Sequence, residues 1–141
     1  MLVRLMYASR AAKPLDPEEL AQILRQSRAT NPKLGITGVL CSSGELFIQV
    51  LEGGRTAVNR LYNQIVTDSR HTEVTLLSYE EIDERRFAGW AMGQVNMARL
   101  NPALMLKYSE TSALDPYAVS GKAAVALFDE LVATAAVVCQ S

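Results

Sequence analysis

The chain has 141 residues, 49% of them hydrophobic, and a formal net charge of −1. A chain of this length and apolar content can build one domain without disulfide staples. Its nearly balanced charge argues against a basic surface for nucleic acid or anionic lipid.

The cysteines and the apolar segments indicate a cytoplasmic protein. Cys41 and Cys139 match no metal-binding spacing and are expected to be reduced. The apolar run at the N-terminus is too short for a signal peptide. Asp129 and Glu130 fall near the middle of the apolar segment 123–139, which favours a buried helix over a membrane span.

The first predicted elements are a strand and a helix. Residues 2–9 should form a strand with Tyr7 on its apolar face. The helix is expected to begin after an N-cap at Asp16 and to end at Asn31-Pro32, because a residue before proline avoids the α region. Its apolar side should carry Leu20, Ile23 and Leu24.

A hairpin, a second helix and more strands follow. The segments GITGVLC (35–41) and ELFIQVLE (45–52) read as strands around a Ser-Gly turn. A helix is predicted over 56–68, and further strands over 74–82 and 90–95. The order βαββαββ is typical of an α+β, ferredoxin-like sandwich with a five-stranded mixed sheet.

The second face of this sheet needs a cover. Both helices of a ferredoxin-like fold lie on one face, yet Ile48 and Val50 point to the other. Residues 97–141 are expected to cover it with a short helix over 102–108 and a longer one over 116–139. The longer helix is apolar on most sides, so it is also expected to meet a partner chain, as in a homo-oligomer.

Few residues suggest catalysis, and the chain is not expected to be an enzyme. His71 falls in a predicted loop, where a solvated histidine is the simpler interpretation. The segment EGGRTAVNR could hold a phosphate at a helix N-terminus, but it lacks the GxxxxGK pattern and a plain turn is favoured.

Polar side chains on the apolar face are more informative. Period two places Gln49 between Phe47 and Leu51, and an unsatisfied buried amide costs about 1–3 kcal/mol. A simple interpretation is that Gln49 and Tyr7 bond one another. Two further residues, Trp90 and Met92, are predicted to share a face of the last strand.

The segments LMYAS, GITGVL, FIQVLEG, DSRH and RRFAGWAM stand in the order and spacing of the BLUF family, blue-light sensors that bind FAD. The resemblance covers about residues 2–96. It implies a flavin-binding photosensor domain over 1–96 and a C-terminal helical extension over 97–141. The segment LMLKYS resembles the short stand-alone members. FMN or riboflavin could replace FAD, because recognition centres on the ring.

The resemblance also implies roles for individual residues. Gln49 would bridge Tyr7 and the flavin, and Asn31 would bond a flavin carbonyl and N3. The other implied contacts are Ile23 and Ile65 on the ring faces, which could equally be plain core, and Asp68 and Arg70 after the second helix. Thr30 and Gln64 depart from residues that several members carry, which puts individual contacts in question.

The implied mechanism is a light-driven switch. Excitation would draw an electron and a proton from Tyr7 through Gln49 and leave the amide rearranged. An exchange of Trp90 and Met92 beside Gln49 would then shift the last strand and the C-terminal helices, and so signal to a separate protein. No catalytic output domain is expected after residue 96.

Two other functions fit the predicted fold. One is a ferredoxin-like regulatory module that binds a small metabolite or a protein without a chromophore. The other is a small acylphosphatase-like hydrolase, for which EGGRTA is a weak phosphate loop. The regulatory module does not explain why a tyrosine, a glutamine and an asparagine should converge on an apolar interior.

Overall fold

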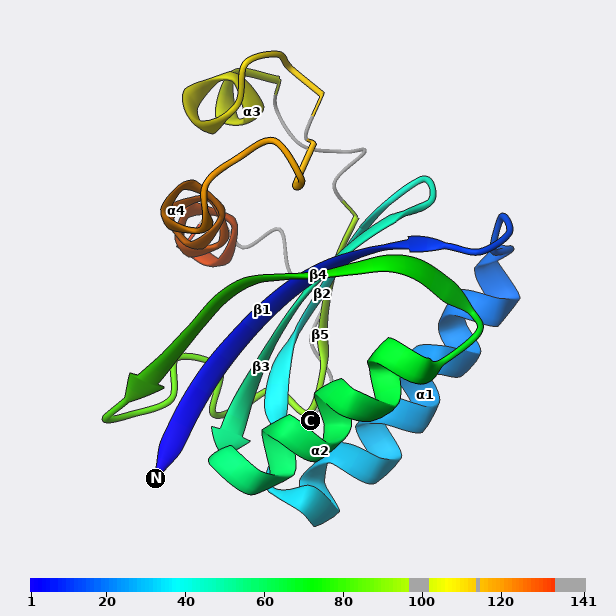
Figure 1. Ribbon diagram of the computed structural model, residues 1–141, viewed down its shortest axis with the longest axis vertical. Coiled ribbons are helices and arrows are strands. Elements are labelled where there is room, and N and C mark those ends of the chain that lie inside the picture. The colour runs from blue at the N-terminus through cyan, green and yellow to red at the C-terminus, as the bar shows by residue number, and fades with distance from the viewer. Residues whose placement is uncertain (97–101, 114, 134–141) are drawn as a thin grey trace.

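The helices pack on the two faces of a single sheet (Figure 1). The structure, a computed structural model, describes residues 1–96, 102–113 and 115–133. The elements are β1 (Leu2–Ala11), α1 (Pro17–Leu34), β2 (Thr37–Ser43), β3 (Leu46–Gly54), α2 (Arg55–Thr67), β4 (His71–Ile82), β5 (Gly93–Asn96), α3 (Pro102–Tyr108) and α4 (Gly121–Ala133).

The sheet is five-stranded in the order β4-β1-β3-β2-β5. The neighbouring strands are antiparallel except β2 and β5, which run parallel. Helices α1 and α2 cover one face, and α3 and α4 lie on the other (Figure 1). The predicted α+β, ferredoxin-like fold with a mixed sheet is confirmed.

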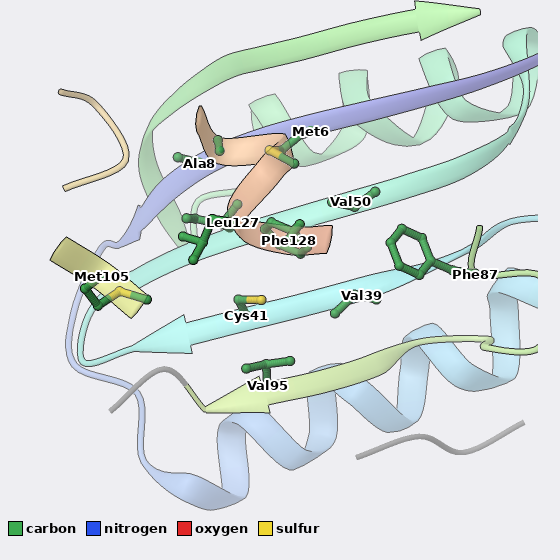
Figure 2. Close-up of a cluster of buried hydrophobic side chains, with 12 residues drawn as sticks. Met6, Ala8, Val39, Cys41, Val50, Phe87, Val95, Met105, Leu127 and Phe128 are labelled. Atoms are coloured by element: carbon green, nitrogen blue, oxygen red, sulfur yellow. The ribbon is translucent and has the colours of Figure 1, made fainter. Parts of the chain in front are cut away.

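The alternation of side chains along β3 divides the apolar residues into two cores. Phe47 and Leu51 pack in the core under α1 and α2, whereas Ile48 and Val50 pack in the core under α3 and α4. Figure 2 shows side chains of α3 and α4 over the second face: Met105, Leu127 and Phe128 lie above Val39, Cys41 and Val50. The predicted cover of this face is therefore confirmed.

The ends of two predicted helices differ from the structure. Helix α1 passes through Pro32 and ends at Leu34, so the predicted end at Asn31-Pro32 was wrong. A left-handed Gly35, with φ of 69°, closes it and donates its N–H to Pro32 O at 3.2 Å. The predicted helix over 116–139 corresponds to α4, but α4 begins at Gly121, so the predicted start at Pro116 was wrong; residues 134–139 lie outside the described residues.

The last strand begins later than expected. β5 starts at Gly93, so Trp90 and Met92 belong to the β4–β5 loop, residues 83–92. Met92 is buried in the core under α1 and α2, while Trp90 packs on the opposite core and stacks on Phe87 with 5.6 Å between ring centroids. The prediction that Trp90 and Met92 share a face was wrong, because a loop does not alternate its side chains with period two.

Across residues 1–96, 102–113 and 115–133, no helix has the length and apolar character that crossing a bilayer requires. In the same ranges, no group of three or more His, Cys, Asp or Glu side chains could hold a metal ion.

Candidate functional site

A cavity of about 320 Å³ lies between the sheet, α1 and α2. Strands β1 and β3 contribute one wall, with Tyr7 and Gln49 at its centre. The residues that sequence reasoning assigned to cofactor binding all line this cavity: Tyr7, Ile23, Asn31, Gln49, Ile65, Asp68 and Arg70. The remaining two candidates, Trp90 and Met92, are not part of the lining.

Tyr7 and Gln49 face each other across neighbouring strands. They are register partners of β1 and β3, and the Tyr7 hydroxyl donates a hydrogen bond to Gln49 Oε1. Both side chains are buried, with 4% and 7% of their surface exposed. Burial raises the pKa of Tyr7 well above its ordinary value, so the phenol stays protonated and acts as the donor.

The other end of the Gln49 amide points to the β4–β5 loop. Gln49 Nε2 donates to Met92 Sδ over 3.4 Å. A thioether is a weak acceptor, so this contact is much weaker than the Tyr7 hydrogen bond. The amide is therefore held firmly at its oxygen and loosely at its nitrogen.

Helix α1 holds the chain next to Met92. Asn31 Nδ2 donates to Ala91 O at 3.0 Å, and Arg28 Nε donates to Met92 O at 3.0 Å. Asn31 is 3% exposed and also lines the cavity, so one side chain contacts both the cavity and the loop. Sequence reasoning missed Arg28, although its i, i+3 spacing to Asn31 places both on one side of the helix.

Asp68 and Arg70 form an ion pair at the rim of the cavity. Arg70 Nη2 lies 2.6 Å from Asp68 Oδ2, and the Arg70 backbone N–H donates to Asp68 Oδ1 at 2.9 Å. The hydrogen bond from the Arg70 side chain is the main reason that the Asp68 pKa falls to about 2. The pair thus fixes the end of α2 and presents a guanidinium beside the cavity.

His71 and Ser9 also line the cavity, and sequence reasoning assigned neither to the site. His71 is the first residue of β4 and pairs with Ala11, so the predicted loop position was wrong. Its Nε2 donates to Ile65 O at 2.8 Å, and its Nδ1 lies 3.1 Å from Ser9 Oγ. Ser9 could have been found from period two, since it shares the face of Tyr7.

Comparison with known sequences identifies the family. The profile described as "BLUF: Sensors of blue-light using FAD" matches residues 2–93. The chain is 38% identical over 92 residues to photoactivated adenylate cyclase subunit beta of Euglena longa, and 43% identical over 84 residues to subunit alpha of Euglena gracilis. These matches cover 64% and 60% of this chain but only 11% and 8% of those relatives.

Solved structures agree with the family match. A structure titled "BlrB - a BLUF protein, dark state structure" is 37% identical, with a TM-score of 0.77 over 94% of this chain and 96% of that one. "BlsA photo-activated state" is 31% identical, with a TM-score of 0.82 over 94% and 95% of the two chains. The chain belongs to the BLUF family of blue-light sensors that use FAD.

The cavity suits the flavin that defines the family. Aliphatic side chains from two helices, Ile23 and Ile65, border it, while Gln49 and Asn31 present amides and Arg70 a cation. A mostly apolar pocket with a few converging polar groups is typical of a cofactor site. An aromatic ring with a hydrogen-bonding edge and a charged tail matches this set of donors and acceptors.

Proposed function

We propose that blue light switches the hydrogen bonds of Gln49 and that the β4–β5 loop and the C-terminal helices pass this change to a partner protein. The supporting observation is the unbroken series of contacts from Tyr7 through the Gln49 amide to Met92. It connects the cavity wall to the segment that leads into β5.

Six of the residues that line the cavity have a proposed role in flavin binding. Gln49 and Asn31 hold the polar edge of the ring, and Ile23 and Ile65 pack on its two faces. The Asp68–Arg70 pair closes the rim, with the guanidinium placed for negative charge. Recognition of the ring alone would admit FAD, FMN or riboflavin.

When bound and excited by blue light, flavin supplies a strong one-electron oxidant. Tyr7 is the electron donor in this proposal. Loss of an electron turns the phenol into a strong acid, and its proton moves along the existing hydrogen bond to Gln49 Oε1. Once the electron and the proton have returned, the amide keeps a rotated or tautomeric form with different donors and acceptors.

The rearranged amide changes the contact with Met92. A hydrogen-bond difference of about 1–3 kcal/mol is enough to bias a two-state element, since about 1.4 kcal/mol corresponds to a tenfold population change. Met92 and Trp90 lie on opposite sides of the sheet, so we propose a displacement of the loop that carries both rather than an exchange on one strand face.

We also propose that two parts of the chain have different roles. Residues 1–96 act as the photosensor, and residues 97–141 as a helical extension that contacts a separate signalling protein or another copy of the chain. The family match over residues 2–93 supports the boundary, and the match to BlrB and BlsA extends over nearly the whole chain. The cyclase relatives match over only 8–11% of their length, so their activity is not assigned to this chain, which we propose is not an enzyme.

An absorption spectrum of the flavin-loaded protein before and after blue light tests the proposal. We expect a red shift that decays in the dark and is absent in Gln49→Leu. Gln64→Leu is the matched control, because Gln64 also lines the cavity but has no hydrogen bond with Tyr7 among the described residues. A shift that survives in Gln49→Leu would overturn the switch, and a colourless protein after reconstitution would overturn the photoreceptor assignment.

A further inference from the structure

A buried carboxylate lies on the opposite side of β3 from Gln49. Glu52 follows Gln49 on the same strand, on the face that carries Ile48 and Val50, and its side chain is 0% exposed. A buried charge is tolerated only when it is paired and hydrogen-bonded. Its cross-strand neighbour Arg4 supplies the charge, with Nη2 2.7 Å from Glu52 Oε2.

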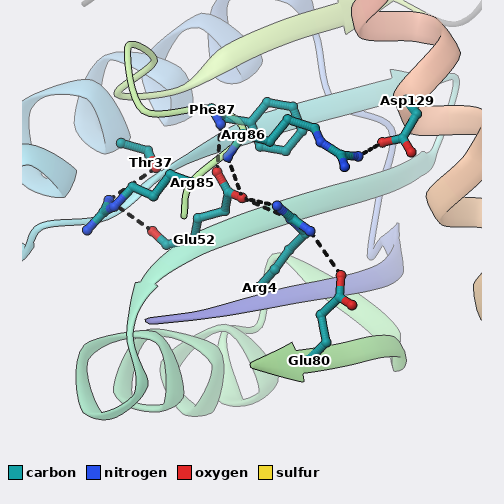
Figure 3. A network of polar contacts seen from close by, with 8 residues as sticks. All are labelled: Arg4, Thr37, Glu52, Glu80, Arg85, Arg86, Phe87 and Asp129. Atoms are coloured by element: carbon teal, nitrogen blue, oxygen red, sulfur yellow. Dashed lines mark hydrogen bonds and ion pairs between the residues drawn. The ribbon is translucent and has the colours of Figure 1, made fainter. Parts of the chain in front are cut away.

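The same carboxylate fixes the first half of the β4–β5 loop. The Arg86 N–H donates to Glu52 Oε2 at 3.0 Å and the Phe87 N–H to Oε1 at 2.7 Å (Figure 3). The Phe87 ring is 3% exposed in the core under α3 and α4. Moving this part of the loop would leave two backbone donors without their acceptor and Glu52 with Arg4 alone, which makes Glu52 a strong anchor.

The second half of the loop is fixed near the cavity. Asn31 and Arg28 bind the carbonyls of Ala91 and Met92, and Gln49 contacts the Met92 sulfur. The two halves are joined by a hydrogen bond of 3.0 Å from the Trp90 N–H to Phe87 O. A displacement that starts at Met92 therefore acts on a segment that is held at both ends.

The loop also contacts the C-terminal helix. The Arg86 guanidinium pairs with Asp129 of α4 (Figure 3), and both side chains are 44% exposed. Phe87 shares its core with Leu127 and Phe128 of the same helix. The loop thus meets α4 through an exposed ion pair and a buried apolar contact.

We propose that the β4–β5 loop, positioned by Glu52, carries the light-induced change from Gln49 to α4 through the Arg86–Asp129 pair. This inference rests on the proposed function. It makes Glu52 a positioning residue that never contacts the flavin, and it makes the ion pair the link between sensor and helix. Coupling of this kind requires one element whose two arrangements are biased from both ends.

Hydrogen exchange of α4 amides, measured in the dark and under blue light on the flavin-loaded full chain, tests the link. We expect Arg86→Gln and Asp129→Asn each to reduce the light-dark difference in residues 121–133 about fivefold, with the flavin red shift unchanged. The double variant should lose no more than either single one. The reversed pair, Arg86→Asp with Asp129→Arg, should restore the difference.

Lys107→Gln is the matched control. Lys107 pairs with Glu130 of α4 and, among the described residues, has no hydrogen bond or ion pair with the loop, so its removal should leave the light response of α4 intact. Glu52→Gln should speed dark-state exchange in residues 83–92 and weaken the α4 response while the red shift stays. If Glu52→Gln fails to fold, the exposed-pair variants decide the question.

Two results would overturn the inference while the photoreceptor function stands. One is a wild-type protein whose flavin shifts while α4 exchange does not respond to light. The other is a normal α4 response in Arg86→Gln and Asp129→Asn. A wild-type flavin that does not shift at all would instead overturn the proposed function, and the link with it.

Discussion

Gln49 stands between a strong donor and a weak acceptor, and this asymmetry gives the site its capacity to switch. Tyr7 donates to the amide oxygen from a neighbouring strand, while the amide nitrogen donates to the sulfur of Met92. Turning the amide in the dark would abandon the stronger bond. Rotation of the amide becomes favourable only after Tyr7 has lost its electron and proton. The orientation of the Gln49 amide is therefore coupled to the chemistry of Tyr7.

Tyr7→Phe should therefore abolish the red shift while the purified protein keeps its flavin. The phenylalanine ring fills the space of the tyrosine ring, but it has no hydroxyl proton to transfer. The variant leaves Gln49 Oε1 without its donor and should lower the free energy of unfolding by about 1–3 kcal/mol. Tyr62→Phe is the control, since Tyr62 lies 5.7 Å from Tyr7 between ring centroids and is not bonded to Gln49. Absorption spectroscopy and urea denaturation measure the two effects.

The Asp68–Arg70 pair predicts a dependence of stability on pH. The Asp68 pKa is about 2 in the folded protein and 3.8 ordinarily, so the folded state favours the ionised form. The resulting stabilisation is fully present above pH 3.8 and is lost as pH falls towards 2. We expect Asp68→Asn to be less stable than wild type at pH 7, with the difference closing as pH falls through this range.

Urea denaturation at a series of pH values checks this prediction. Arg70→Gln should behave in the same way, because it removes the partner of the same carboxylate. A stability difference between wild type and Asp68→Asn that stays constant down to pH 2 would contradict the assigned cause.

At the residue scale, sequence reasoning could find side chains whose strand or helix period places them on the cavity face. Tyr7 and Gln49 were found in this way, and the family resemblance supplied Asn31, Asp68 and Arg70. It could not find Glu52, because an acidic residue at the end of a strand normally reads as solvated. Its burial depends on Arg4 and on loop N–H groups that lie far away in the sequence.

Among the elements, the docking of α4 on the sheet depends on a glycine. A Cβ at Gly121 would lie 2.3 Å from Leu77 O of β4, closer than real Cβ contacts come. Alanine in a helix is normally favoured over glycine by about 1 kcal/mol. We expect Gly121→Ala to be destabilising despite this preference, because the first turn of α4 must move away from β4.

Thermal unfolding measures the effect, with Gly89→Ala as the control. A Cβ at Gly89, in the β4–β5 loop, would meet no heavy atom within 4 Å apart from those of its chain neighbours. This control should change the free energy of unfolding by no more than about 0.5 kcal/mol. A Gly121→Ala variant as stable as wild type would mean that α4 does not dock closely at this point.

The positions of elements were better predicted than their ends. Asp16 caps α1 as expected, accepting a hydrogen bond from the Glu19 N–H at 2.8 Å. The predicted end of α1 at Asn31-Pro32 was wrong. The rule that a residue before proline avoids the α region was outweighed by the left-handed cap at Gly35, which lies beyond the predicted end. The start of β5 could not be predicted, because WAMGQV alternates like a strand although its first half is held as a loop by Asn31 and Arg28.

Across the whole molecule, the sheet has a hydrophobic core on each face. Helices α3 and α4 contribute to one of these cores and therefore to the stability of the sheet. Phe128 of α4 is 2% exposed and packs against residues of the sheet. We expect Phe128→Ala to lower the free energy of unfolding by about 3–5 kcal/mol. The unfolding should remain a single transition by circular dichroism and flavin release, and separate transitions would show that α3 and α4 unfold independently.

The place of β5 was the part of the architecture that required the structure. The order of elements predicts a ferredoxin-like fold and hence β1 between β3 and β4, but not that β5 pairs parallel to β2 at the edge of the sheet. That pairing depends on contacts between distant segments. Whether the chain forms a homo-oligomer or meets a separate protein stays a prediction.

The placement of the cavity residues along the chain has a consequence for biosynthesis. All of the lining lies between Tyr7 and His71, whereas the β4–β5 loop and α4 follow it. During translation, every wall of the cavity therefore leaves the ribosome before the segments that would report on it. In a growing chain, the proposed flavin-binding residues are therefore synthesised before the segments proposed to transmit the light signal.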